Sequence, residues 1–151
     1  LGITWKQFDL SLLFQGQAKV INTIQETWVD PSSGGAGNLM QWWTEDMWTP
    51  ENTDGTKPRL GTPNKINGTT FTNINAAFFK LKNAEIGYTL PVAVREKIGV
   101  ANARVYLSGT NLFSFDHMRG MGIDPEATGS GYGGWALNPQ RLINLGVNVS
   151  F

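Results

Sequence analysis

The chain contains no cysteine, and this absence excludes both a disulfide-stabilised scaffold and a metal site built on thiolates. It also has no net charge, because twelve basic residues balance twelve acidic ones. Nothing in the composition therefore indicates a nucleic-acid partner or binding to an anionic membrane surface. No apolar run approaches the length of a transmembrane helix. A membrane β-barrel remains possible, because its strands are short and apolar on one face only.

Catalytic signatures are also lacking. The single histidine, His117, lies beside Asp116, and the nearest acidic motif is Asp124-Pro-Glu126. Scattered carboxylates around one histidine do not form a defined metal site, and Asp124-Pro125 is typical of a turn. No nucleophile motif, phosphate-binding loop or dinucleotide fingerprint is present. We therefore predict no metal, no cofactor and no catalytic residue.

The clearest pattern in the chain is the alternation between Arg141 and Phe151. Small polar residues alternate there with five apolar residues: Ile143, Leu145, Val147, Val149 and Phe151. In a β-strand this spacing produces one apolar face and one polar face. Soluble sandwich strands also alternate, but chain ends usually fray, and this strand is the most regular one. A strand between lipid and a watery lumen requires this division.

Three further segments read as strands, at 5–17, 74–90 and 103–115. The first two supply the residues that we predict to face lipid, which are Phe8, Leu10, Leu12, Phe14, Ala84, Ile86, Tyr88 and Leu90. Phe79 and Leu81 lie in the opposite phase to Ala84, which indicates either a bulge or a departure from the apolar layer. Gly109 and Asn111 interrupt the third segment, so its orientation stays open.

The connections between these strands are unequal. Residues 18–73 and 116–140 form long connections, whereas 91–102 is short and has room for helical turns between Pro91 and Gly99. Long loops on one side and short turns on the other are typical of outer-membrane barrels. The predicted fold class is all-β: about four antiparallel transmembrane β-barrel strands, with two long extracellular loops and one short periplasmic turn.

Four strands cannot close a barrel, because the smallest membrane barrels have about eight. An open sheet edge in lipid would leave backbone amides without hydrogen bonds. The chain also starts at Leu1 and carries no secretory signal peptide. We therefore expect residues 1–151 to be the C-terminal segment of a longer protein.

Several motifs resemble the C-terminal part of SusC/RagA-like TonB-dependent outer-membrane transporters. In order, they are Trp48-Thr-Pro-Glu-Asn52, Pro58-Arg-Leu60, the segment Leu81 to Pro91, the segment Arg104 to Leu112, Asp124-Pro-Glu126 and the strand ending at Phe151. The resemblance implies a plugged barrel in the outer membrane of a Bacteroidota-type Gram-negative bacterium, surrounded by lipid. It implies import of glycans or peptides with a SusD-like surface lipoprotein. The plug domain, TonB box and signal peptide would lie outside this chain, and TonB would act through that N-terminal region.

Several residues are candidates for particular roles. The terminal strand, Ile143 to Phe151, looks like the signal that the barrel-assembly machinery reads, because a strand with an aromatic end can pair with an open sheet edge. Trp42, Trp43 and Trp48 in the first long loop either contact a substrate or the lipoprotein, or pack the loop. Tyr132 and Trp135 lie in a glycine-rich stretch that suits a binding loop and a merely flexible loop equally.

Charged residues on the strands constrain their orientation. Lys80, Lys82 and Arg104 would each cost about 2–4 kcal/mol on a lipid face at mid-depth, so we expect them to face the lumen or lie near the interfaces. The alternative function is a soluble, secreted β-sandwich that binds glycans through loop tryptophans. The uncharged apolar faces of the first and last strands, and long loops on one side only, weigh against that alternative.

Overall fold

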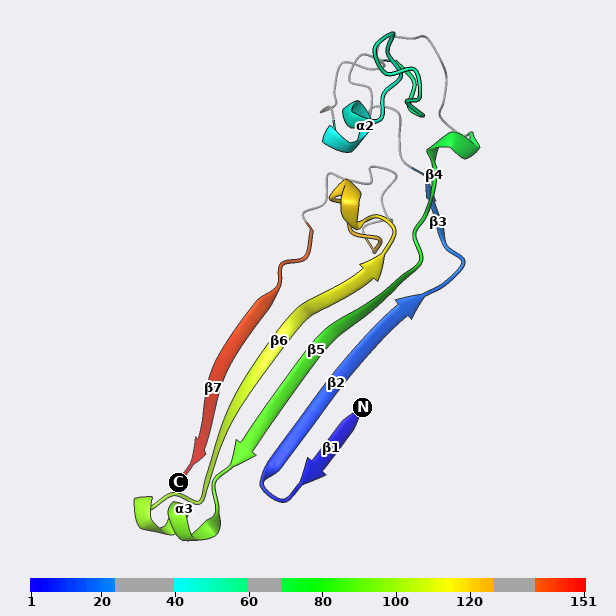
Figure 1. Ribbon diagram of the computed structural model, residues 1–151. Helices are drawn as coiled ribbons and strands as arrows, with labels where there is room; N and C mark the ends of the chain where they lie inside the picture. The colour runs from blue at the N-terminus through cyan, green and yellow to red at the C-terminus, as the bar shows by residue number, and fades with distance from the viewer. Residues whose placement is uncertain (24–39, 60–68, 127–137) are drawn as a thin grey trace. The chain divides into compact units, whose positions relative to one another are not determined.

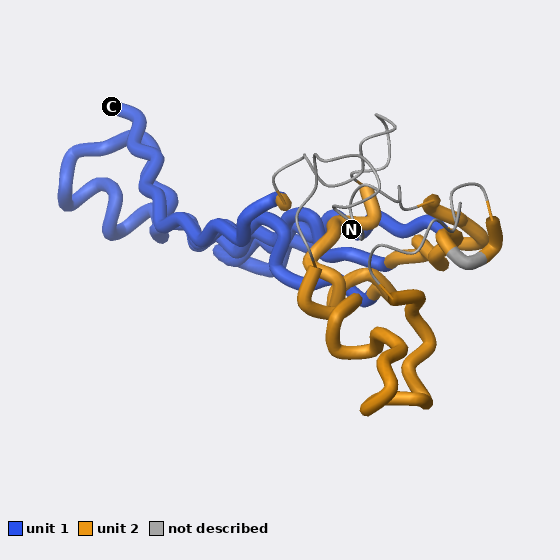
Figure 2. The backbone as a smooth tube through the Cα atoms, turned by 90° about the horizontal axis from the view of Figure 1, so that it is seen from above, with its two compact units in different colours: residues 1–17, 79–115, 139–151 blue, residues 18–78, 116–138 orange. Residues whose placement is uncertain are grey.

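The computed structural model describes residues 1–23, 40–59, 69–126 and 138–151 (Figure 1). The chain divides into two compact units, which Figure 2 colours separately. We call residues 1–17, 79–115 and 139–151 the sheet unit, and residues 18–78 and 116–138 the loop unit. Among the described residues, no helix combines the length and the apolar character needed to cross a bilayer.

The sheet unit is built on five strands in the order β1-β2-β5-β6-β7. Their bounds are β1 Gly2–Trp5, β2 Phe8–Gln17, β5 Phe78–Thr89, β6 Asn102–Asp116 and β7 Leu142–Ser150. Neighbouring arrows in Figure 1 point in opposite directions, so the sheet is antiparallel. This antiparallel sheet agrees with the predicted all-β fold class.

The N-terminal edge of the sheet differs from the prediction. A single strand was expected from residue 5, but Trp5 ends β1 and Phe8 begins β2, with Trp5 and Phe8 paired across the hairpin. Lys6 turns the chain with a φ of 54°. This is the left-handed region that glycine or asparagine usually occupies in tight hairpins. Because Lys6 and Gln7 carry no such turn signal, the sequence did not reveal the additional strand β1.

The predicted strand at 74–90 is interrupted. Ile74 belongs to a separate short strand, β4 (Asn73–Asn75), and β5 starts only at Phe78. Within β5 the phase also changes. The Tyr88 ring lies 4.8 Å from the Phe8 ring, and the Phe79 ring stacks on Phe14 at 5.5 Å. Phe8 and Phe14 are in phase on β2, whereas Phe79 and Tyr88 are out of phase on β5, so the two ring contacts are those expected if a β-bulge changes the phase of β5 between them.

Strand β6 changes phase as well. Asn111 has a φ of 53° in the middle of the strand. A Cβ added to Gly109 would lie only 2.6 Å from the δ2 methyl carbon of Leu112, so the two residues are on the same side of the sheet. Two residues three positions apart therefore share one face, which regular alternation does not allow. The open question about the orientation of this segment is answered by a reversal at Asn111.

The short connection contains the helix α3 (Val92–Ile98). Pro91 precedes it, and Gly99 ends it with a φ of 70° while its backbone N–H donates to the carbonyls of Arg95 and Glu96. This is the left-handed glycine cap that stops many helices. The helical turns predicted between Pro91 and Gly99 are confirmed.

The loop unit combines short elements around a small core. Strand β3 (Ile21–Thr23) pairs with β4, and the other elements are α2 (Gln41–Glu45), η2 (Thr70–Thr72) and η3 (Arg119–Met121). The buried residues of its core are Trp43, Ala76, Met118 and Ile123. They come from distant parts of the chain, so the two long connections fold together rather than separately.

Candidate functional site

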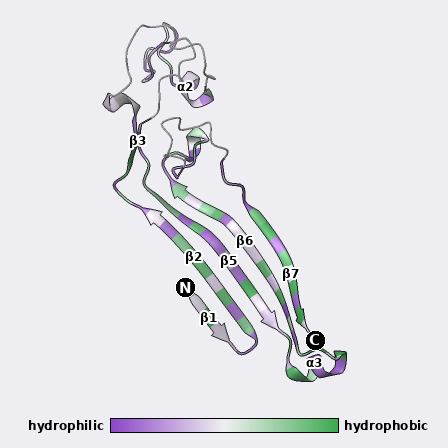
Figure 3. Cartoon of the chain, turned by 180° about the vertical axis from the view of Figure 1, so that it is seen from behind, coloured by the Kyte–Doolittle hydropathy of each residue, from purple (hydrophilic) through white to green (hydrophobic). Residues whose placement is uncertain are grey.

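The sheet unit presents one aliphatic face. Along β6 and β7, Val105 pairs with Val147 and Leu107 pairs with Leu145. Leu145 is 75% exposed, and Ile143, Val147 and Val149 are also exposed. Figure 3 shows the resulting alternation of hydrophobic and hydrophilic residues along the strands. A water-soluble protein rarely exposes a continuous apolar surface of this kind.

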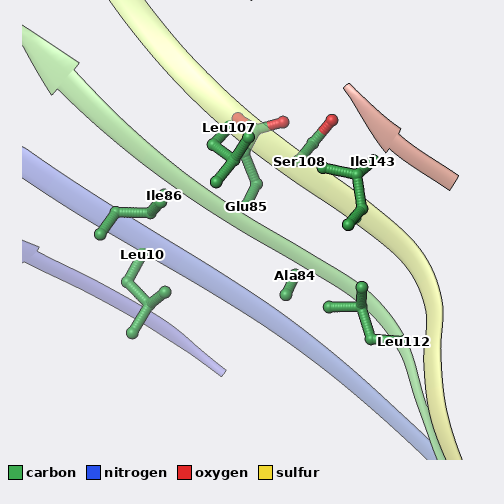
Figure 4. A pocket seen from close by; sticks show the side chains of 9 residues that line it. Leu10, Ala84, Glu85, Ile86, Leu107, Ser108, Leu112 and Ile143 are labelled. Carbon is green, nitrogen blue, oxygen red and sulfur yellow. The ribbon is translucent and has the colours of Figure 1, made fainter. Parts of the chain in front are cut away.

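The same face continues over β1, β2 and β5. Ile3 pairs with Leu10, and Leu10, Ala84 and Ile86 line one pocket together with residues of β6 and β7 (Figure 4). The rings of Phe8 and Tyr88 are in contact, as are those of Phe14 and Phe79. Leu12 lies in phase with Leu10. Leu90 follows the last residue of β5 and donates its N–H to Ala103.

The opposite face carries an ion-paired cluster that we call the Arg104 triad, formed by Arg104, Asp9 and Glu85. Arg104 donates from Nε to Asp9 Oδ1 at 3.0 Å and forms a second, short hydrogen bond to the same carboxylate. Its Nη2 also donates to Glu85 Oε1 at 2.7 Å. Paired hydrogen bonds between a guanidinium and a carboxylate are strong and directional. The triad therefore connects β2, β5 and β6 away from the aliphatic face.

Two glycines make room for this cluster. A Cβ on Gly87 would lie 2.2 Å from Arg104 Nη2, so any larger residue would displace the guanidinium. The Tyr106 ring lies 5.1 Å from the Arg104 guanidinium carbon, in a cation–π geometry. A Cβ on Gly146 would in turn meet the Tyr106 ring at 2.3 Å. The glycines at these positions are thus explained by close packing against bulky side chains.

Of the three strand cations, Arg104 agrees with the expectation that such residues avoid the aliphatic face. Arg104 is directed to the opposite side by its pairing with Asp9 and Glu85. Lys80 is buried close to the end of β5 that the first long connection enters. The sequence predicted where Arg104 would not point, but it did not identify its partners, because Asp9 is 95 positions away.

The loop tryptophans differ in their surroundings. Trp43 is 4% exposed and belongs to the core of the loop unit, so its ring offers little surface to a ligand. Trp42 is partly buried and meets Trp43 edge-on at 5.7 Å. Trp48 is 42% exposed. Tyr132 and Trp135 lie outside the described residues.

The motif from Trp48 to Asn52 forms a tight turn. Thr49 and Asn52 exchange two backbone hydrogen bonds, at 3.2 and 3.0 Å, and the Asn52 side chain donates to the carbonyl of Met47 at 3.0 Å. Gly55 passes so close to Met47 that a Cβ there would lie 2.6 Å from its backbone. These contacts assign a structural role to Asn52 and Gly55 that is independent of any ligand.

A second polar cluster stabilises the same loop. The backbone N–H of Thr56 donates to Asp46 at 3.2 Å, its hydroxyl makes a short hydrogen bond to the same carboxylate, and Lys57 Nζ lies 3.4 Å away. The Thr56 hydroxyl, followed by its N–H and by Lys57, holds the pKa of Asp46 below its ordinary value.

The acidic residues of the second long connection organise turns. Asp124 accepts a hydrogen bond from the N–H of Glu126 at 2.8 Å, and Asp116 accepts one from the N–H of Met118 at 3.0 Å. Asn138 bridges the carbonyl of Gly122 and the N–H of Asp124. Within the described ranges no group of three or more potential ligands is placed to hold a metal ion.

Phe151 and the terminal strand complete the set of predicted site residues. Strand β7 ends at Ser150, and Phe151, which follows it, is 96% exposed. The N–H of Ala101 donates to the carbonyl of Ser150 at 2.8 Å, so pairing with the β6 side persists to the last residue of the strand. The sheet unit therefore forms a wall with one aliphatic side and one side bearing ion pairs.

Comparison with known proteins identifies relatives of this wall. A scan against models of protein families finds no match. The chain is 31% identical to TonB-dependent receptor P26 and 29% identical to TonB-dependent receptor P3, both from Formosa agariphila, with 99% of the chain aligned in each case. It covers only 16% and 15% of their lengths, so it corresponds to a small part of these receptors.

Solved structures give the same result. The RagAB peptide importer in its closed-closed state matches with a TM-score of 0.72, and the open-open state matches with 0.68. Both are 26% identical to this chain, and the match covers 99% of this chain and 16% of theirs. The resemblance to SusC/RagA-like TonB-dependent transporters that the motifs indicated is confirmed, as is the predicted fold class.

Proposed function

Because this chain is similar in sequence and fold to a segment of SusC/RagA-like TonB-dependent transporters, we propose that the complete protein imports bulky nutrients across an outer membrane. The segment would be the C-terminal part of a barrel in a Gram-negative bacterium of the Bacteroidota type. A plug domain, a TonB box and the remaining strands would lie in the rest of the protein, and TonB would supply energy through that N-terminal region. No catalytic step is required of residues 1–151.

The observation that carries this proposal is the difference between the two faces of the sheet. The aliphatic face exposes Leu145, Val147 and Val149, which suits contact with lipid chains. The other face carries the Arg104 triad, whose charges would be costly in hydrocarbon but are tolerated at a hydrated lumen. An antiparallel sheet with this division is the repeating wall of a membrane barrel.

The class of substrate is proposed from the relatives. The similar solved structures are named as a peptide importer, so a peptide is one candidate, and an oligosaccharide is the other. A SusD-like surface lipoprotein would close over the extracellular mouth and deliver the substrate. Among the described residues, the exposed Trp48 is the best candidate for contact with a substrate or the lipoprotein. Trp42, Tyr132 and Trp135 are further candidates. Trp43 is the least suitable of the group, because it packs the core.

The terminal strand would serve assembly. Its aliphatic residues, Ile143, Leu145, Val147 and Val149, face lipid in the finished barrel, and Phe151 ends the segment that the barrel-assembly machinery recognises. The aromatic residue at the end of the strand supports this role, because a strand with such an end can pair with an open sheet edge. Removal of Phe151 from the complete protein would lower its amount in the outer membrane.

Uptake by the complete protein tests the proposal. The complete protein would be expressed together with a SusD-like lipoprotein from the same organism in a host with TonB, and accumulation of fluorescent oligosaccharides and peptides would be measured. We expect uptake of one of the two substrates that is lost when TonB is deleted and strongly reduced without the lipoprotein. Trp48→Ala should weaken uptake while leaving the amount of assembled protein unchanged. A protein that fractionates as soluble without detergent, or uptake independent of TonB, would contradict the proposal.

A further inference from the structure

An apolar pocket of about 160 Å³ lies on the aliphatic face of the sheet unit (Figure 4). Its floor is formed where two small residues, Ala84 on β5 and Gly109 on β6, leave a gap in the layer of larger side chains. Leu10, Ile86 and Ile143 line its sides. The pocket therefore interrupts a surface that is otherwise covered by branched aliphatic groups.

The lining is apolar because its two polar residues direct their side chains elsewhere. Glu85 is hydrogen-bonded to Arg104 on the opposite face. Ser108 alternates with Leu107 and Gly109, so its side chain also belongs to the opposite face. Water finds few polar partners in such a site, whereas hydrocarbon groups match its lining. The chemistry of the lining selects methylene groups rather than a head group.

Leu112 lines one side of the pocket. Leu112 lies so near Gly109 that a Cβ there would come within 2.6 Å of the Leu112 δ2 methyl carbon. Because Leu112 follows Gly109 along β6, it bounds the pocket at the end of the sheet that the long connections join. The reversal of phase at Asn111 is what brings this side chain onto the aliphatic face. A chain occupying the pocket would thus approach from the end where α3 and the short connection lie.

We propose that this pocket binds an acyl chain of a phospholipid from the periplasmic leaflet. The inference rests on the proposed function, because that function places the aliphatic face in lipid and the short connection on the periplasmic side. Ala84 lies about midway along β5 between Phe79 and Tyr88, so the distal part of an acyl chain would reach it. A second copy of the protein is less suitable as an occupant, since the lining provides neither aromatic anchors nor polar partners.

Native mass spectrometry of the intact transporter tests this site. The protein would be purified in a mild detergent, incubated with palmitoyl-oleoyl phosphatidylethanolamine, and compared with Ala84→Leu, which fills the floor of the pocket. Ala93→Leu makes the same chemical change at an exposed position of α3, outside the pocket, and is the matched control. Ala84→Val provides a milder substitution if the leucine variant assembles poorly.

We expect the wild-type protein and Ala93→Leu to retain one more phospholipid per barrel than Ala84→Leu. Displacing about two methylene groups should lower the occupancy of that site roughly tenfold, with a smaller loss for Ala84→Val. Equal phospholipid retention in all four proteins would overturn the site while leaving the transporter proposal intact. A bound mass matching lipopolysaccharide, or a change in oligomeric mass without a change in lipid, would also overturn it. A wild-type protein that stays soluble without detergent would refute the proposed function itself.

Discussion

Apolar residues are largely exposed in the sheet unit and buried in the core of the loop unit. In the sheet unit, Leu145 and Val147 are largely exposed, and the charged groups of Arg104, Asp9 and Glu85 are gathered together. In the loop unit, Trp43, Met118 and Ile123 are buried around a small core. The same chain thus contains one region with a soluble protein's interior and another whose aliphatic side chains face outward.

The difference indicates two solvents. Burial of apolar groups away from water stabilises the loop unit, as in any globular protein. That driving force does not apply where the surrounding medium is hydrocarbon, and there the requirement is to satisfy backbone hydrogen bonds and to remove charges from the lipid side. Substitutions in each unit test this difference.

The largest effect is expected in the core of the loop unit. Trp43→Ala removes a buried ring and should destabilise the local fold by about 3–5 kcal/mol, whereas Trp48→Ala, at an exposed site, should cost less than about 1 kcal/mol. Limited proteolysis and hydrogen exchange over residues 40–57 would measure both. Equal protection in the two variants would mean that Trp43 does not hold this core together.

A cation on the aliphatic face should have the next largest effect. Leu145→Lys should reduce the stability of the assembled barrel by about 2–4 kcal/mol if the residue is near the bilayer midplane. Asn144→Lys places the same group on the opposite face of β7 and should be much better tolerated. The folded fraction can be read from gel mobility without boiling. Similar losses in the two variants would contradict the assignment of faces.

Disrupting the Arg104 triad should have an intermediate effect. Arg104→Ala leaves Asp9 and Glu85 without their partner and should cost about 1–3 kcal/mol, since the carboxylates remain partly exposed to water. Arg104→Lys keeps the charge but loses the paired geometry, so its stability should lie between those of the wild type and Arg104→Ala.

Gly87 sharpens this prediction. Gly87→Ala should destabilise the wild-type barrel, because its Cβ would collide with the guanidinium, but it should be nearly neutral in the Arg104→Ala background. Urea unfolding of the four proteins forms a double-mutant cycle. Additive effects of the two substitutions would show that the close contact has no energetic consequence.

The smallest effect concerns pH in the loop unit. The Thr56 hydroxyl lowers the pKa of Asp46, so the carboxylate stabilises this loop at pH values above its unfolded pKa, and the contribution fades as pH falls through the lowered pKa. Thr56→Val should raise that pKa and move the loss to higher pH. Hydrogen exchange of residues 46–57, corrected for its intrinsic pH dependence, would detect the shift. An unchanged profile would exclude a role for the hydroxyl.

The sequence was informative where a single physical requirement acts on every second residue. The alternation in β7 indicated its two faces because the polarity of each residue matches the medium that its side chain contacts. The helix α3 could be predicted from Pro91 and Gly99, since these residues act locally. The same reasoning explained why Arg104 should avoid the aliphatic face.

Features that depend on neighbouring strands could not be read in this way. The turn at Lys6 lacks glycine, asparagine and proline, so the hairpin of β1 and β2 left no local signal. The change of phase in β5 is recognised only from ring contacts with β2, and the reversal in β6 depends on the backbone of Asn111. The partners of Arg104 and the core position of Trp43 likewise arise from residues far apart in the chain.

The account is tested most directly by measuring which medium each residue of β7 meets. Because residues 1–151 contain no cysteine, single cysteines can be placed in this segment from position 143 to 149 of the complete transporter and labelled with a nitroxide. Collision with oxygen, which dissolves in lipid, and with a water-soluble nickel chelate would then be compared. We predict high oxygen access at 143, 145, 147 and 149, and nickel access only at the positions between them. Nickel access at all seven positions, or no alternation, would contradict the two-faced membrane wall.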